Sequence, residues 1–131
     1  MPNRDSEILA INQAMLECVI NGDWQGYVNF CSESVSCFEA ETNGILVEGL
    51  PFHRFYFPST APEQKAEDAK SVQVTMARPH LRWLNETAVV VSYTRLVQRL
   101  VDGDFMTSSC CETRIWQQLD GRWQQVHVHR S

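Results

Sequence analysis

The sequence predicts an α+β fold, in which helices from the start of the chain pack on one face of a curved antiparallel sheet. Two observations lead to this fold class. Apolar side chains recur at helical spacing over residues 5–30, whereas residues 71–130 carry long runs of strand-forming residues separated by turn residues. The chain has 131 residues, which is the size of one domain, so residues 1–131 are treated as a single domain.

The first predicted element is a helix from about Asp5 to Asn21, because apolar residues recur there every three or four positions. Gly22 ends this helix, since glycine readily takes the left-handed conformation that is common at helix C-termini. Asp23 is a suitable N-cap for a second, short helix. The residues that this second helix needs to bury are mostly aromatic: Trp24, Tyr27, Val28 and Phe30.

Short elements connect the helices to the second half of the chain. We expect a hairpin made of strands 34–39 and 45–47, with the turn residues 41–44 between them. Pro51 suits the first turn of a short helix from Phe52 to Phe57. Residues 58–70 are predicted to form the one long loop, because they are polar, contain two prolines and lack an apolar period.

The second half of the chain is predicted to be a meander of long strands. Residues 71–77 alternate between apolar and polar side chains, and residues 81–84 continue this strand beyond Pro79. Further strands are expected at residues 87–100, 107–119 and 122–130. Asp120-Gly121 is a strong signal for a hairpin turn between the last two strands.

The composition excludes several functional classes. The net charge is −5, so the chain lacks the basic surplus that is typical of nucleic-acid binding. No apolar run approaches the ~18 residues of a membrane span, and the polar N-terminus lacks the apolar core of a signal peptide. Five cysteines are an odd number, which without a secretion signal indicates free thiols. We therefore expect a cytoplasmic protein with neither nucleic-acid nor membrane partners.

Three arginines in the predicted strands suggest an anion-binding site: Arg95, Arg114 and Arg130. Each shares a strand face with apolar residues, which indicates that other parts of the chain cover this face. A buried guanidinium group needs a counter-charge or water, and three such groups that converge favour a carboxylate ligand. Two alternatives stay open. The arginines lie on the open face of the sheet, or Glu112, two residues before Arg114, neutralises them.

The register of the last hairpin decides whether Arg114 and Arg130 share a face. A two-residue turn at Asp120-Gly121 puts the two arginines on opposite faces of the sheet. A three-residue bulged turn, which pairs Gln118 with Arg122, puts them on the same face. The pocket hypothesis therefore predicts the bulged turn.

Several segments of the chain resemble the association (hub) domain of calcium/calmodulin-dependent protein kinase II, a branch of the nuclear transport factor 2-like proteins. These segments are Asn21–Trp24, Leu46–Leu50, Phe52–Phe57, Glu112–Trp116, Asp120–Trp123 and Val126–Ser131. The resemblance covers the chain from about Ile8 to its end. It implies a cone-shaped, curved antiparallel sheet wrapped around a long N-terminal helix (nuclear transport factor 2-like or cystatin-like), with a deep pocket between them. The chain departs from the animal hubs at residues 58–70, which contain no tryptophan.

The resemblance also implies an assembly and a binding site. Arg95, Arg114 and Arg130 match the pocket arginines of the hub family, and His53 matches its pocket histidine, so these are the expected ligand-binding residues for small carboxylates or acidic peptide side chains. The implied assembly is a homo-oligomer, a two-tiered ring that is a dodecamer, a tetradecamer or a larger ring. In the family this ring gathers kinase domains. We expect this chain to be an isolated or free-standing hub that is not an enzyme and uses no cofactor.

The competing hypothesis is a small pocket enzyme of the same superfamily, such as an isomerase, cyclase or dehydratase. Such an enzyme needs a base with a tuned pKa, for which His53 and Glu112 are the candidates, although nearby arginines lower the pKa of a carboxyl group and weaken it as a base. His127 and His129 share a strand face, but no neighbouring Cys or Asp completes a metal site, so we expect no metal. Removal of Arg114 is expected to weaken carboxylate binding and to stabilise the empty pocket slightly by relieving repulsion.

Overall fold

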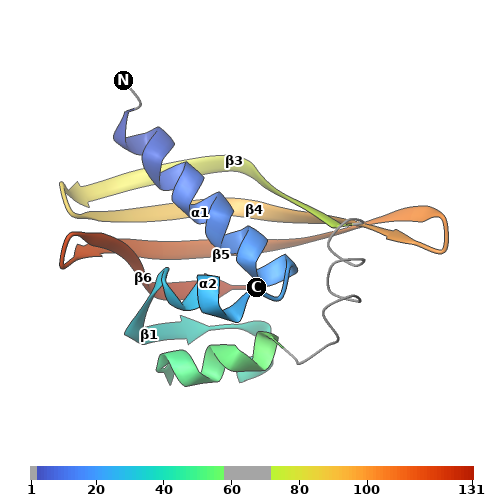
Figure 1. The fold of residues 1–131 in the computed structure, drawn as a ribbon, viewed down its shortest axis with the longest axis horizontal. Coiled ribbons are helices and arrows are strands. Elements are labelled where there is room, and N and C mark those ends of the chain that lie inside the picture. The colour runs from blue at the N-terminus through green and yellow to red at the C-terminus, as the bar shows by residue number, and fades with distance from the viewer. Residues whose placement is uncertain (1–2, 58–71) are drawn as a thin grey trace.

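The computed structural model describes residues 3–57 and 72–131, and it confirms the predicted α+β class. A six-stranded sheet carries two helices on one face, α1 (Arg4–Ile20) and α2 (Trp24–Val28). Figure 1 shows α1 crossing the long strands obliquely, with α2 beside its C-terminal end. Within the described residues, neither helix has the length and apolar character needed to cross a membrane.

The strand order of the sheet is β2-β1-β6-β5-β4-β3. The strands are β1 (Cys31–Phe38), β2 (Val47–Glu48), β3 (Val72–Asn85), β4 (Ala88–Val101), β5 (Asp104–Leu119) and β6 (Arg122–Arg130). All neighbouring strands are antiparallel except β1 and β6, which pair in parallel. The predicted meander thus corresponds to β3 through β6, and the chain's first strand returns to pair with its last.

Side-chain caps explain where the two helices begin. The Asn3 side chain accepts a hydrogen bond from the Ser6 backbone N–H at 2.8 Å, and the Asp23 side chain accepts one from the Gly26 N–H at 2.9 Å. Such caps satisfy backbone donors that have no partner inside a helix. Gly22, just past the end of α1, has a φ of 67°, the left-handed conformation that the sequence predicted.

The connecting elements differ from the prediction in detail. β1 starts at Cys31 instead of residue 34, and β2 contains only two residues. Residues Ala40–Thr42 form a short 3-10 turn, η1, where an open hairpin turn was expected. The predicted short helix is also a 3-10 helix, η2 (Leu50–Tyr56), which starts two residues early. The predicted loop at residues 58–70 lies outside the described residues.

The pairing of β3 with β4 on both sides of Pro79 confirms that one strand continues beyond this proline. The pairing with β4 shifts between Ala77 and His80, and Arg78 has a φ of 51°. A bulge of this kind inserts an unpaired residue and kinks the strand. β3 is an edge strand, where a proline without an N–H is tolerated.

The predicted bulged turn between β5 and β6 is wrong, but the arginines still share a face. Leu119 pairs with Arg122, so Asp120-Gly121 is a tight two-residue turn, and both of its residues have positive φ. The one-residue shift in register occurs further from the turn, since Trp116 pairs with Gln125 whereas Ile115 pairs with His127. The extra residue lies within β6 and not in the turn. Beyond it, the side chains of Arg114 and Arg130 point to the same side.

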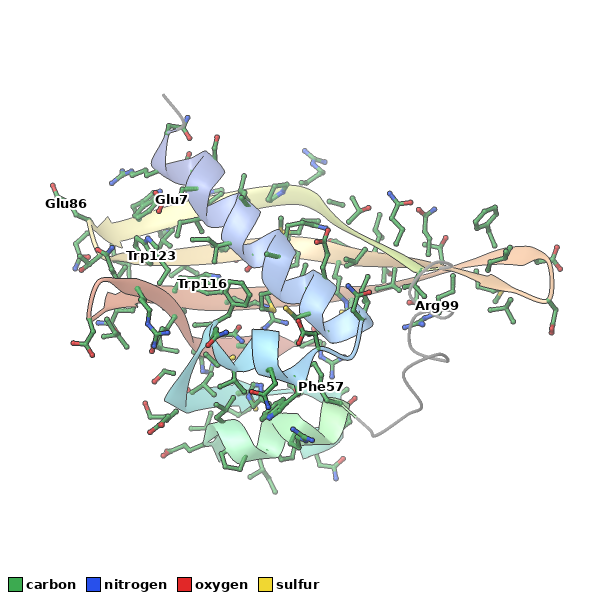
Figure 2. All side chains as sticks on the ribbon, viewed as in Figure 1. Glu7, Phe57, Glu86, Arg99, Trp116 and Trp123 are labelled. Carbon is green, nitrogen blue, oxygen red and sulfur yellow. The ribbon has the colours of Figure 1, made fainter. Side chains whose placement is uncertain are left out.

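The core lies between α1 and the sheet face that carries the three arginines. Trp116 is completely buried there, and its indole N–H donates to the Asn12 side-chain oxygen at 2.9 Å. Figure 2 shows Trp116 on the sheet behind the helices. Asn12 is itself fully buried, and its amide group also contacts the Met76 sulfur at 3.1 Å. This polar contact between two fully buried side chains fixes the position of α1 along β5.

We predict that Asn12→Ala lowers the free energy of unfolding by about 1–3 kcal/mol, because it leaves the Trp116 N–H buried without an acceptor. Urea denaturation at one fixed protein concentration measures this effect, since assembly changes apparent stability. Glu7→Gln, on the exposed part of the same helix, is the control and should change stability by less than about 0.5 kcal/mol. An Asn12 variant as stable as the control would contradict the prediction.

Candidate anion-binding pocket

A cavity of about 270 Å³ lies between the C-terminal turn of α1, α2 and the sheet. Its wall contains all three predicted arginines. The lining residues are Val19, Ile20, Tyr27, Glu39, Phe57, Arg95, Val97, Arg99, Ser108, Arg114 and Arg130. His53, the fourth predicted residue, does not line this cavity. The helices and Phe57 supply mostly apolar lining, whereas the strands supply the arginines together with Val97 and Ser108.

The Glu112 carboxylate connects two of the arginines that line the pocket. One oxygen lies 3.0 Å from the Arg114 guanidinium, and the other lies 3.3 Å from the Arg95 guanidinium. The Tyr93 hydroxyl also donates to this carboxylate. Burial alone raises the pKa of the Glu112 carboxyl, but the charges of Arg114 and Arg95 outweigh burial and hold its pKa below the usual range. Glu112 is therefore ionised at neutral pH.

Arg114 is buried and makes contacts from every nitrogen. Its Nε donates to Glu112 at 3.0 Å and to the Tyr93 hydroxyl at 3.1 Å, and a terminal nitrogen donates to the Gln125 side-chain oxygen at 2.7 Å. Gln125 in turn donates to the Tyr27 hydroxyl at 2.9 Å. This chain of hydrogen bonds connects β5, β6 and α2 across the floor of the pocket.

His53 lies behind Tyr27 and not at the pocket edge. Its Nδ1 is 2.7 Å from the Tyr27 hydroxyl, and the side chain is almost completely buried. Burial, with a smaller effect from the charge of Arg114, lowers the pKa of His53 to about 4. The imidazole is therefore neutral at pH 7. His53 does not line the cavity, whereas Tyr27, whose hydroxyl it contacts, does.

Arg130 is paired with carboxylates at the other side of the pocket. It lies 2.8 Å from a Glu41 oxygen and 3.8 Å from a Glu39 oxygen. Glu39 is buried, and within the described part of the chain its second oxygen, Oε2, has no hydrogen-bond partner. All three predicted arginines thus have a counter-charge within the protein. Neutralisation by Glu112 was one of the two alternatives that the sequence left open.

The expectation that removing Arg114 stabilises the empty pocket is wrong. It assumed three guanidinium groups that repel one another. In the structure Glu112 lies between Arg95 and Arg114 and attracts both of them. Removing Arg114 would leave a buried carboxylate with a single partner, which is strongly destabilising.

Sequence reasoning missed several residues of the site. Arg99 and Ser108 line the cavity. Extending the strand alternation from Arg95 would have found Arg99, and extending it from Arg114 would have found Ser108. Gln125 could not, because the shift in β6 changes which residues face inward. Tyr27 was assigned only to packing, and its hydroxyl instead joins His53 to the hydrogen-bond chain.

The two histidines of the opposite sheet face do not form a metal centre with a third ligand. His127 and His129 share that face as predicted, and both contact the Phe38 ring. Among residues 3–57 and 72–131, no group of three or more His, Cys, Asp or Glu side chains could hold a metal ion. The five cysteines, all within the described residues, form no disulfide.

Solved structures of similar fold include hub domains. The chain superimposes with a TM-score of 0.86 on the calcium/calmodulin-dependent kinase II hub homology domain of Chlamydomonas reinhardtii, at 43% identity and 98% coverage of both chains. The association domain of the Caenorhabditis elegans kinase gives a TM-score of 0.85 at 36% identity, over 98% of this chain and 95% of that one. A nuclear transport factor 2-like superfamily protein from Salmonella enterica, at 18% identity and a TM-score of 0.67, shares the fold.

The sequence comparisons agree with the structural ones. The chain is 37% identical over 129 residues to the calcium/calmodulin-dependent protein kinase type II alpha chain of Drosophila melanogaster. That match covers 98% of this chain but only 24% of the fruit fly protein. The model of the calcium/calmodulin dependent protein kinase II association domain matches residues 4–131. The chain therefore belongs to the calcium/calmodulin-dependent protein kinase II association domain family.

Proposed function

We infer that this chain is a self-associating hub whose copies assemble into a closed, two-tiered ring of dimers, a dodecamer or a tetradecamer. We further infer that its arginine-lined pocket binds small carboxylates or acidic peptide side chains. Membership of an association domain family supports the first inference. The observation that carries it is an exposed apolar surface on a projecting part of the sheet.

That surface is the end of the β4–β5 hairpin, which we call the hairpin arm (residues 100–106). Figure 1 shows this hairpin, in orange, projecting beyond both helices. The large apolar side chains of the arm are exposed, with Phe105 the most exposed at 78%. The exposed set is Leu100, Val101, Phe105 and Met106. Leu100 and Phe105 pair on one face of the arm, and Val101 and Met106 lie on the other face. Exposed apolar side chains gathered on one projecting element mark a surface that another molecule covers.

A second copy of the chain is the partner that fits this surface. The chain belongs to a family named for association, and closed symmetry covers every copy of an apolar surface without producing open fibres. A ring of dimers uses two kinds of contact, one within the dimer and one between dimers. The hairpin arm supplies one of them, because it lies at one end of the subunit and can reach a neighbour.

The pocket supports the carboxylate inference through its unused donors. Four guanidinium groups line the cavity, and the Nε of Arg95 is buried with no hydrogen-bond partner among the described residues. A buried donor without an acceptor is unfavourable unless a ligand or water supplies one. Arg95 keeps about a fifth of its side chain exposed, whereas Arg114 is almost fully enclosed. Arg95 is therefore the arginine best placed to meet an incoming carboxylate.

The same geometry favours binding over catalysis. A general base works best when its pKa lies near the working pH and its atoms reach the substrate. His53 has a pKa of about 4 and lies outside the cavity wall, and two arginines stabilise the ionised form of Glu112. Neither candidate base from the sequence therefore has both the position and the proton affinity that an isomerase or dehydratase requires.

We predict that Phe105→Asp lowers the mass of the assembled particle, because it puts a charge into a contact between copies. Native mass spectrometry at micromolar concentration measures the particle mass. Leu84→Asp is the matched control, since Leu84 is 60% exposed at the end of the sheet opposite the arm and should leave the mass unchanged. A wild-type protein that is a monomer or a simple dimer would overturn the assembly itself. If both variants lower the particle mass equally, the hairpin arm is not a specific contact between copies.

We predict that Arg95→Gln weakens binding of butyrate by about tenfold or more, since a hydrogen bond to a charged group contributes about 1.5–3 kcal/mol. Isothermal titration calorimetry at low ionic strength measures the affinity. Arg82→Gln makes the same change of charge on an exposed part of β3, and it should have little effect. If both variants bind butyrate equally well, the carboxylate site lies elsewhere.

We predict that Arg114→Ala destabilises the protein by about 3–5 kcal/mol, because it leaves the Glu112 carboxylate buried with a single charged partner. The double variant Glu112→Gln/Arg114→Ala removes that stranded charge and should recover part of the loss. Denaturant unfolding of the two variants and the wild type tests the order of stabilities. The explanation fails if the double variant is less stable than the single one.

A further inference from the structure

The outer end of the pocket contains a fourth arginine, Arg99, that the proposed carboxylate site does not use. Arg99 follows Arg95 by four residues on β4, and Val97 lies between them on the same face. Val97 pairs with Ser108 of β5, which also lines the cavity. Figure 2 shows Arg99 where the sheet continues beyond the C-terminal turn of α1. The cavity therefore extends from the buried arginines to an exposed guanidinium and a hydroxyl group.

Within residues 3–57 and 72–131, the charge of Arg99 is not offset in the way that the other pocket charges are. Glu112 contacts Arg95 and Arg114, and the carboxylates of Glu39 and Glu41 contact Arg130. Among the residues that the structure describes, no carboxylate forms an ion pair with Arg99. Arg99 therefore adds a positive charge to the pocket mouth that an anionic ligand can neutralise.

Arg95 and Arg99 are too far apart to hold one carboxylate together. Four strand residues span about 13 Å between their Cα atoms. The guanidinium group of Arg95 also turns away from Arg99, because it contacts Glu112, whose β4 partner is Tyr93. Two separate groups on a ligand are needed to use both arginines.

The wall between the two arginines is apolar. Val97 is almost completely buried, and Val19, Ile20 and Phe57 from outside the sheet also line the cavity. A chain of methylene groups suits this stretch, since apolar surface is stabilised by contact with apolar surface. The pattern along the cavity is thus an inner donor, an apolar middle and an outer cation.

We propose that Arg99 and Ser108 form a second anion-binding position, and that the pocket selects a dicarboxylate whose two carboxylate groups are joined by a short methylene chain. The inner carboxylate meets Arg95, and the outer one meets Arg99 and the Ser108 hydroxyl. This proposal rests on the proposed carboxylate-binding function and names its ligand class. Arg99 is then the residue that distinguishes a dicarboxylate from a monocarboxylate of the same length.

The test compares adipate with hexanoate, which have the same number of carbons and differ in the second carboxylate. Titration calorimetry at low ionic strength uses the assembled wild-type protein, Arg99→Gln and the control Arg82→Gln. We expect wild type to bind adipate about tenfold more tightly than hexanoate. Arg99→Gln should remove this preference by weakening adipate alone, and Arg82→Gln should keep it. Succinate and pimelate, which are shorter and longer, should bind less tightly than adipate.

Each other outcome decides against the proposal. If Arg99→Gln weakens the binding of hexanoate as much as that of adipate, Arg99 contributes only to the overall positive potential of the pocket and does not bind a second carboxylate. If wild type binds hexanoate and adipate equally, there is no second anion position, although the carboxylate function stands. If wild type binds neither acid while its assembly is intact, the proposed carboxylate function fails as well. Both Arg99 and Arg82 are exposed, so these substitutions leave the fold intact and the comparison interpretable.

Discussion

The structure of the pocket depends on one buried carboxylate, that of Glu112, held between Arg95 and Arg114. Without it, buried guanidinium groups on adjacent strands would face one another in a medium where charges interact strongly. With it, Arg114 becomes part of the protein's interior and binds Gln125, which in turn holds Tyr27 of α2. The carboxylate therefore does two things. It makes the charged layer stable, and it determines which arginines keep donors for a ligand.

The same constraint explains why this pocket suits binding better than chemistry. Two cations stabilise the ionised form of Glu112, and burial keeps His53 neutral, so neither group changes its protonation near neutral pH. Tyr27 and Tyr93 keep their protons as well, because burial raises the pKa of each hydroxyl. Groups that do not titrate give a fixed pattern of donors and charges. We expect such a fixed pattern to recognise a ligand by its charge and length.

The sequence predicted the fold class, the two helices and the long strands, because these follow from local periodicity and turn residues. Strand alternation and the family resemblance together pointed to Arg95, Arg114 and Arg130, which line one cavity, and their role in binding a ligand stays a prediction. Sequence reasoning failed where a local pattern has two equivalent solutions. A bulge in the turn and a bulge within β6 shift the register by the same one residue, and both place Arg114 and Arg130 on one face. Contacts between distant segments were also out of reach, since no periodicity relates Glu41 to Arg130 or Tyr27 to Gln125. His53 was assigned to the pocket edge by resemblance alone, and its position behind Tyr27 depends on such a contact.

Strand alternation lets one hairpin serve both proposed roles. Arg95, Val97 and Arg99 face the pocket, and the residues between them face the other side of the sheet. Leu100 directly follows Arg99 and begins the hairpin arm, where apolar side chains are exposed. The charged wall of the proposed ligand site and the apolar surface of the proposed assembly contact are thus consecutive on the same two strands. If a neighbouring subunit covers the hairpin arm as proposed, it also holds the strand that carries Arg99, so we expect the proposed assembly and the proposed ligand recognition to depend on the same two strands.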